Sequence, residues 1–221
     1  RRRLIETAIT GVLFFPMLKT SLTSERKAHA AVIRPPGSLP EPEFLRRCIK
    51  CSLCMRVCPT NVLQPALLEG GLEGLWTPIL VNKIGYCEHQ CVLCSQVCPT
   101  GAIRKISVED KVGTPSPKGV TLGTAFYDRG RCLPWAMNVE CIVCEEVCPT
   151  SPKAIWFEEK QLQERDGGIK KLKLPSVDPT LCTGCGICEN KCPVGDIPAI
   201  RVTSVGESRS KTNQMILKDL V

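Results

Sequence analysis

The chain has 221 residues, of which 16 are cysteine. Its large aromatic residues are few: five Phe, three Trp and two Tyr. The 43% hydrophobic share includes those cysteines, so the truly apolar share is low for a globular domain. Large side chains alone cannot easily stabilise such a chain, and we expect something else to fill its interior. Proline and glycine without period exclude collagen, and the absence of an apolar run of about 18 residues excludes a multi-span membrane protein.

The formal net charge of +7 treats every cysteine as neutral. If the cysteines are thiolates on four iron–sulfur cubanes, each with a core charge of about +2, the holoprotein carries a charge of about −1. We therefore exclude nucleic-acid binding, for which the aromatic residues are also too sparse.

The N-terminus, with Arg1, Arg2 and Arg3 before Leu4 and Ile5, resembles a twin-arginine export signal followed by the apolar stretch 7–18. We expect residues 1–30 to be an uncleaved signal or anchor helix, with membrane contact through residues 1–20. An amphipathic helix buried in a soluble protein is the alternative. The signal-like start predicts that the protein lies on the periplasmic side of a membrane. A cytoplasmic location is the alternative.

Residues 31–43 are rich in proline and predict an extended linker. Residues 111–123 and 160–173 predict surface loops. Residues 204–221 predict a polar tail that either docks on a partner or frays.

Four groups of four cysteines, each followed by proline, dominate the rest of the chain. The first and fourth match the bacterial ferredoxin run C-x2-C-x2-C-x3-C-P. The second has one extra residue in its first gap, and the third has eight residues there. In chain order the groups are Cys48, Cys51, Cys54 and Cys58; Cys87, Cys91, Cys94 and Cys98; Cys132, Cys141, Cys144 and Cys148; and Cys182, Cys185, Cys188 and Cys192.

This spacing predicts four [4Fe-4S] clusters. Three closely spaced cysteines wrap a loop around one cluster, and in two-cluster ferredoxins the fourth ligates the other. An apolar anchor follows each fourth cysteine. A disulfide framework does not explain four copies of the x2-x3-Pro spacing, and structural zinc favours separated C-x2-C pairs.

The segment Ile33-Arg34-Pro35-Pro36-Gly37, followed by Phe44-Leu45-Arg46-Arg47-Cys48, resembles the periplasmic ferredoxin-type proteins of the NapG/MauM family. The resemblance extends from the arginine start to Cys192. It implies a membrane-associated electron carrier beside a quinol-oxidising membrane partner, which passes electrons to a further carrier or catalytic subunit.

The fourth cysteines can be shared between neighbouring groups or in nested order. Nesting is the order in four-cluster subunits of respiratory oxidoreductases, which the chain resembles in its regular outer and altered inner motifs. We expect nesting. The ligand sets would then be Cys48, Cys51, Cys54 with Cys192; Cys182, Cys185, Cys188 with Cys58; Cys87, Cys91, Cys94 with Cys148; and Cys132, Cys141, Cys144 with Cys98.

The expected fold class is α+β, with two nested pseudo-symmetric ferredoxin-like modules, long loops and an N-terminal helix. The outer module comprises residues 44–75 and 174–203, and the inner module comprises residues 76–173.

Five residues are expected to shape the cluster surroundings. Arg46, Lys50 and Arg56 place positive charge at the first motif, which should raise that cluster's potential. His89 is a candidate hydrogen-bond donor to a sulfur, and Trp135 is a candidate shield or docking residue.

Sixteen cysteines leave no open iron position in four clusters, and no catalytic constellation is present. The sequence thus predicts a non-catalytic electron-transfer subunit of a larger, membrane-associated respiratory complex. A cluster scaffold or maturation factor is the alternative.

Overall fold

The computed structural model describes residues 32–113, 119–163 and 168–215. Its elements are short helices and three two-stranded antiparallel sheets, which confirms a mixed α and β architecture. The expected N-terminal helix lies outside the described residues. Within the described ranges, no helix is long and apolar enough to cross a membrane.

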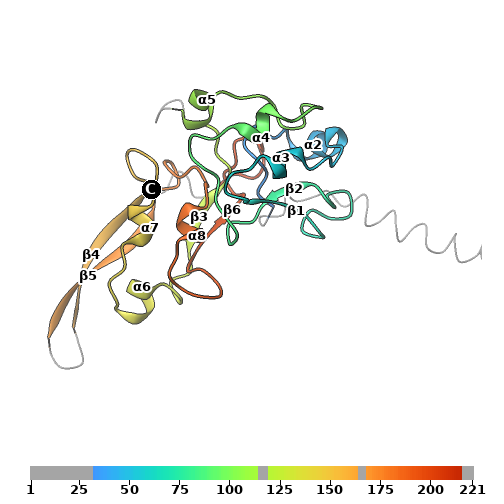
Figure 1. Ribbon diagram of the computed structural model, residues 1–221. Helices are drawn as coiled ribbons and strands as arrows, with labels where there is room; N and C mark the ends of the chain where they lie inside the picture. Colours follow the sequence, from blue (N-terminus) through green and yellow to red (C-terminus); the bar gives the residue numbers. More distant parts are fainter. Residues whose placement is uncertain (1–31, 114–118, 164–167, 216–221) are drawn as a thin grey trace, which may run out of the picture.

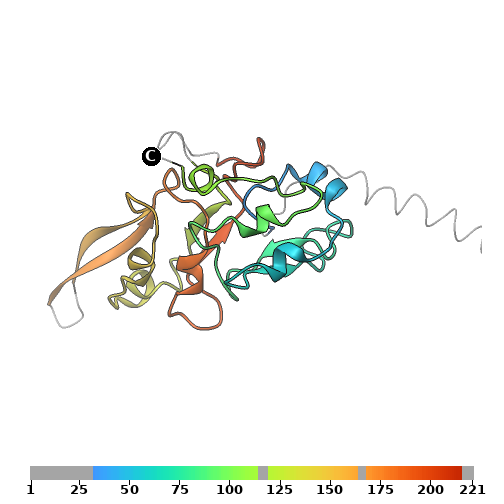
Figure 2. The same ribbon diagram turned by 45° about the horizontal axis from the view of Figure 1, so that its top comes forward.

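The chain forms two modules built to one plan, which lie side by side (Figures 1 and 2). We call residues 37–104 the N-terminal module and residues 124–203 the C-terminal module. Each contains two cysteine motifs joined by a β-hairpin, and its first and last segments pair to close it. The modules therefore follow one another along the chain, and the prediction of nested modules is wrong.

The N-terminal module closes through a bridge between Ser38 and Ile103. Backbone bonds on either side of the bridge run from Leu39 N to Ala102 O and from Arg104 N to Gly37 O. The hairpin between its motifs consists of β1 (Leu63–Pro65) and β2 (Pro78–Leu80).

The C-terminal module closes through β3 (Thr124–Tyr127), which pairs with β6 (Ile200–Thr203). Its hairpin consists of β4 (Ile155–Gln163) and β5 (Ile169–Val177) and projects from the far end of the molecule (Figure 1). Most of the segment 160–173, expected as a surface loop, is therefore paired strand.

One short helix follows the second cysteine of each motif and carries the third. These are α3 (Leu53–Arg56), α4 (Leu93–Gln96), α7 (Val143–Glu146) and α8 (Ile187–Asn190). Helix α3 packs against α4, and α7 packs against α8, so each module brings its two motifs together. The remaining helices are α2 (Glu41–Arg47), α5 (Val108–Val112) and α6 (Leu133–Met137).

Residues 32–39 are irregular, with a turn at Pro36 and Gly37, but they are buried and do not form a linker. Ile33 O accepts a backbone bond from Leu80 N, and Val32 packs with Ala66 and Ile79. Proline suits this segment because prolines tolerate extended backbone and need no N–H partner. The proline-rich composition predicted a linker, whereas this segment forms part of the buried core.

The described part of the C-terminal tail also packs on the body. Glu207 is buried, and Arg209 binds both Glu207 and Glu41 of α2. Residues 204–215 therefore belong to the folded unit, while residues 216–221 lie outside the described part.

Candidate metal centres

The sixteen cysteines gather in four cavities, each lined by four thiols. All sixteen are free thiols. Cavity A is lined by Cys48, Cys51, Cys54 and Cys98; cavity B by Cys58, Cys87, Cys91 and Cys94; cavity C by Cys132, Cys141, Cys144 and Cys192; and cavity D by Cys148, Cys182, Cys185 and Cys188.

The fourth cysteine of each motif thus joins its neighbour's cavity, and the nested pairing is wrong. Cys98 meets the first motif in cavity A, and Cys192 meets the third motif in cavity C. The hairpin between paired motifs explains why. It turns the chain back within one module, so α3 meets α4 and α7 meets α8 before the chain proceeds.

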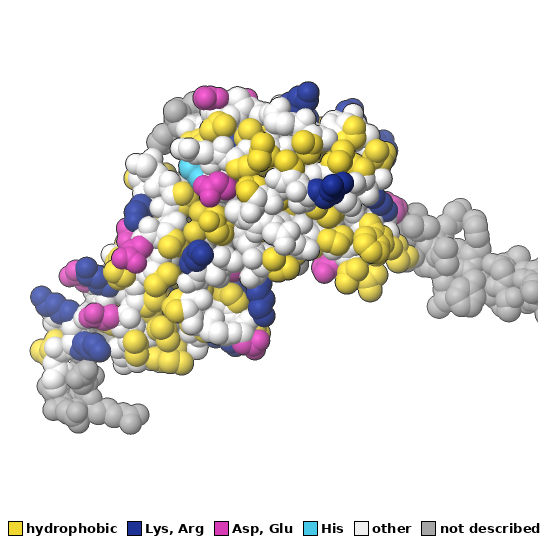
Figure 3. All heavy atoms as spheres, viewed as in Figure 1, with side chains coloured by type: hydrophobic (Ala, Val, Ile, Leu, Met, Phe, Trp, Pro, Cys, Tyr) yellow, Lys and Arg dark blue, Asp and Glu magenta, His cyan; other side chains and the backbone are white. Residues whose placement is uncertain are grey.

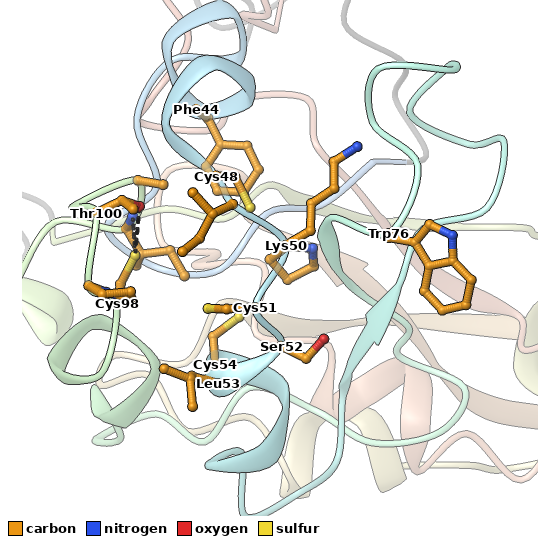
Figure 4. A pocket seen from close by; sticks show the side chains of 15 residues that line it. Phe44, Cys48, Lys50, Cys51, Ser52, Leu53, Cys54, Trp76, Cys98 and Thr100 are labelled. Carbon is orange, nitrogen blue, oxygen red and sulfur yellow. Dashed lines mark hydrogen bonds between the residues drawn. The ribbon is translucent and has the colours of Figure 1, made fainter.

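Figure 4 shows cavity A at close range. Cys48 and Cys51 come from the loop before α3, Cys54 comes from α3 itself, Cys98 faces them, and Phe44 lies beside Cys48. Within the described residues, no three His, Cys, Asp or Glu side chains converge on a single metal ion. The thiols surround a space instead of a point, which suits a multi-iron cluster better than zinc.

The apolar anchor expected after each fourth cysteine is present and buried. It lines the same cavity as the cysteine before it. The anchor pairs are Val62 and Leu63, Ala102 and Ile103, Ala154 and Ile155, and Ala199 and Ile200, all at most 4% exposed. These pairs form a buried apolar wall on one side of each cavity.

Hydroxyl groups approach the sulfur atoms in all four cavities. Three motifs continue Cys-Pro-Thr, and the threonine Oγ1 lies 3.3 to 3.8 Å from the cysteine Sγ. The fourth motif has Val194 at that position. There, the Tyr127 hydroxyl lies 2.8 Å from Cys144 Sγ in cavity C. Hydrogen bonds to sulfur are a known lever on cluster potential.

The thiols differ in how readily they lose their protons. Burial raises the pKa of Cys54 and of Cys185 to about 12. Burial also acts to raise the pKa of Cys98, but bonds from the Ile103 N–H and the Thr100 hydroxyl outweigh it and lower that pKa. Cys54 and Cys185 would therefore depend on bound iron to become thiolates.

The five expected environment residues have different positions. Arg46, Lys50 and Arg56 are exposed at the first motif. The half-buried His89 reaches no cysteine sulfur of the described residues, and burial lowers its pKa. Trp135 does not line cavity C; its Nε1 donates to Pro175 O at 3.0 Å and its ring contacts Arg129, so it supports the β4–β5 hairpin.

Sequence reasoning missed Lys111. Its Nζ lies 3.2 Å from Cys87 Sγ in cavity B, and the side chain is buried. The segment 111–123 was expected to be a surface loop, and its composition carried no signal for a buried cation.

The cavities form a row, in the order A, B, D, C. Cys54 of cavity A and Cys94 of cavity B lie close enough to act on each other's charge, as do Cys188 of D and Cys144 of C. Between modules, the backbone N–H of Cys87 donates to Cys185 O at 2.8 Å, which joins B to D.

Polar contacts surround that junction. Asn82 Nδ2 donates to Glu189 Oε2 at 3.0 Å, and Asn190 Nδ2 donates to Asn82 O at 3.1 Å. The two modules are thus held in register where B meets D.

Comparison with known proteins places the chain among ferredoxin-type proteins. The family described as "4Fe-4S binding domain" matches residues 45–64 and 175–197. The methylamine utilization ferredoxin-type protein MauM of Methylorubrum extorquens is 36% identical over 187 residues, covering 84% of this chain and 78% of that protein. MauM of Methylophilus methylotrophus is 35% identical over 184 residues, covering 83% and 76%.

The ferredoxin-type protein NapG of Escherichia coli is 35% identical over 180 residues, covering 80% of this chain and 72% of that protein. No solved structure matches the chain. With cysteine-lined cavities, a matching 4Fe-4S domain and relatives that span most of its length, the chain belongs to the NapG/MauM family of ferredoxin-type, iron–sulfur electron-transfer proteins.

Proposed function

We propose that the chain holds four [4Fe-4S] clusters and serves as a non-catalytic, one-electron wire in a membrane-associated respiratory oxidoreductase complex. The observation that carries this proposal is the row of four cavities, each with four thiols. When bound, such clusters exchange one electron each. No thiol is left over and none is missing, so no iron is left open for a substrate.

The protein fixes the order of the clusters and keeps water away from them. The row A, B, D, C provides one continuous route through both modules, and the buried anchor pairs exclude water from it. The Cys87–Cys185 backbone bond supports transfer from one module to the other because it fixes B and D side by side.

We propose that the cavity A end faces a membrane-bound, quinol-oxidising redox subunit. Among the cysteines of the described residues, only Cys51 is exposed, and apolar side chains gather at this end (Figure 3). They include Ile49, Leu67, Leu68, Leu72 and Trp76, each more than half exposed. The chain also enters the described body here, at Val32. The apolar stretch 7–18 and the arginine start precede it, which supports membrane contact on the periplasmic side.

The cavity C end would face a second carrier or a catalytic subunit. Met137 at the end of α6 is exposed there, as are Val139 and Ile142 on the loop that carries Cys141. Both ends of the row thus offer an apolar surface around a cysteine loop, as a wire with two partners requires.

Anaerobic iron and sulfide analysis with reductive titration tests the proposal. We expect about sixteen iron atoms per chain and four reversible one-electron components. A colourless or zinc-loaded preparation would contradict it. Fewer iron atoms, which pass readily to an apo-ferredoxin, would instead identify a cluster scaffold.

A further inference from the structure

Lys111 lies on helix α5, which is outside the four cysteine motifs. Helix α5 begins with a capping box, in which Asp110 N donates to Ser107 Oγ and Ser107 N donates to Asp110 Oδ2. Such a box fixes the start of a short helix. Lys111, in its last turn, is only 6% exposed. A lysine is almost never so buried unless it is paired.

The Lys111 ammonium has three partners. Nζ lies 3.2 Å from Cys87 Sγ, 2.6 Å from Glu88 O and 2.6 Å from Cys91 O. An ammonium group has three N–H donors and a neutral amine has two, so three acceptors match the charged form. The ion pairs of the described residues give Lys111 no carboxylate partner, and the Cys87 thiol is the group beside Nζ that can carry negative charge.

These contacts also explain the irregular spacing of the second motif. Its first gap holds Glu88, His89 and Gln90, one residue more than the regular motif. The carbonyls of Glu88 and Cys91 turn toward Lys111, which satisfies both.

The third motif, with its longer gap, also has a lysine on one of its carbonyls. Lys170 Nζ donates to Asn138 O at 3.1 Å, yet it reaches no cysteine sulfur of the described residues. The two irregular motifs thus share lysine support, and only the second has a cation against a thiol.

Given the proposed four-cluster wire, we propose that Lys111 makes the cluster of cavity B the highest-potential member of the row. Reduction adds one electron, and hence one negative charge, to a group that already carries four thiolates. A buried ammonium at 3.2 Å stabilises that added charge. An electron that enters the row therefore rests at B, just before the junction between modules.

The exposed cations at cavity A act more weakly. Arg46, Lys50 and Arg56 lie at the surface, where salt screens their charge. Lys111 is dry and pinned by three acceptors, so its effect persists in high salt.

Lys111→Gln tests this assignment, because glutamine keeps donors for the carbonyls and lacks the charge. Lys170→Gln is the matched control at the other irregular motif. Potentiometric titration followed by EPR should show one of four components with a reduction equilibrium constant at least tenfold lower, which is about 59 mV for one electron. The shifted component should be the highest of the four, in low and high salt alike. Lys111→Arg should restore its potential in part, while Lys170→Gln leaves all four unchanged.

Full iron content with four unshifted components overturns the role of Lys111. If Lys111→Gln loses a cluster, the missing component must be the highest one, and loss of any other also overturns it. Wild-type protein with far fewer than sixteen irons is a different failure, since it refutes the four-cluster wire itself.

Discussion

Arg34 is a fully buried guanidinium that joins three parts of the fold. Its donors reach Glu41 on α2 at 3.1 Å, Thr77 Oγ1 at 2.7 Å and Pro78 O at 3.0 Å, and the group lies 4.7 Å above the Phe44 ring. Arg209, from the tail, binds the same Glu41. The network clamps the first segment and the tail around the wall of cavity A.

We expect Glu41→Gln to lower the free energy of unfolding by about 2 to 4 kcal/mol, because it leaves a buried guanidinium underpaired. Glu43→Gln is the control. It breaks an exposed i,i+4 pair with Arg47 and should cost less than about 1 kcal/mol. Anaerobic urea titration of both holoproteins measures the difference, and equal losses would show that the network is not a clamp.

The same carboxylate gives the network a pH dependence. Burial acts to raise the pKa of Glu41, but Arg34 and Arg209 outweigh it and hold that pKa below its usual 4.5. The stabilisation is therefore present above pH 4.5 and is lost as the pH falls through the lower folded value.

Among single residues, the cluster ligands could be predicted from the sequence, but the side chains around them could not. Regular spacing identified all sixteen candidate ligands, because ligand geometry is local and fixes residue separations. Lys111 and Arg34 could not be predicted, since each meets partners more than 15 residues away in sequence.

Among the elements, the hairpins decide which motifs meet. β1–β2 and β4–β5 each return the chain to its own module, and each fourth cysteine then enters its neighbour's cavity. Spacing alone permits adjacent and nested sharing equally, because both satisfy the same local loops. The β1–β2 hairpin is only three residues per strand and leaves little alternating pattern to detect.

Sharing between neighbours predicts that Cys98→Ser and Cys51→Ser affect the same cluster. Cys98 lines cavity A with Cys51, so both variants should alter the same one of four one-electron components. Cys192→Ser should alter a different one, because it lines cavity C. EPR-monitored titration of the three variants compares them. A common effect of Cys51→Ser and Cys192→Ser would restore the nested assignment.

On the scale of the whole molecule, the row of cavities has two unlike ends. The cavity A end carries basic and apolar side chains beside the entry of the chain at Val32. The cavity C end carries helix α6 with the exposed Met137, and the projecting β4–β5 hairpin. Because the two ends differ, we expect each end of the proposed wire to bind a different partner.

Substitutions at one end of the row should slow electron transfer with the partner at that end only. We expect Ile49→Ser with Trp76→Ser to reduce the rate of reduction by quinol in native membranes at least tenfold, because both side chains are exposed beside cavity A. Reduction by dithionite should be unchanged. Ile142→Ser, at the opposite end, should leave quinol-driven reduction intact. Stopped-flow absorbance follows both reactions, and an equal slowing by either variant would argue against docking at cavity A.

The first and fourth motifs adopt the same backbone turn before their helices, with different residues. Gly186 begins α8 at φ 80°, where an added Cβ would collide with the buried Asn82 of the other module. Ser52 begins α3 at φ 61° with its neighbours open to solvent. A side chain is therefore tolerated at position 52, whereas the bare glycine at position 186 lets the two modules touch.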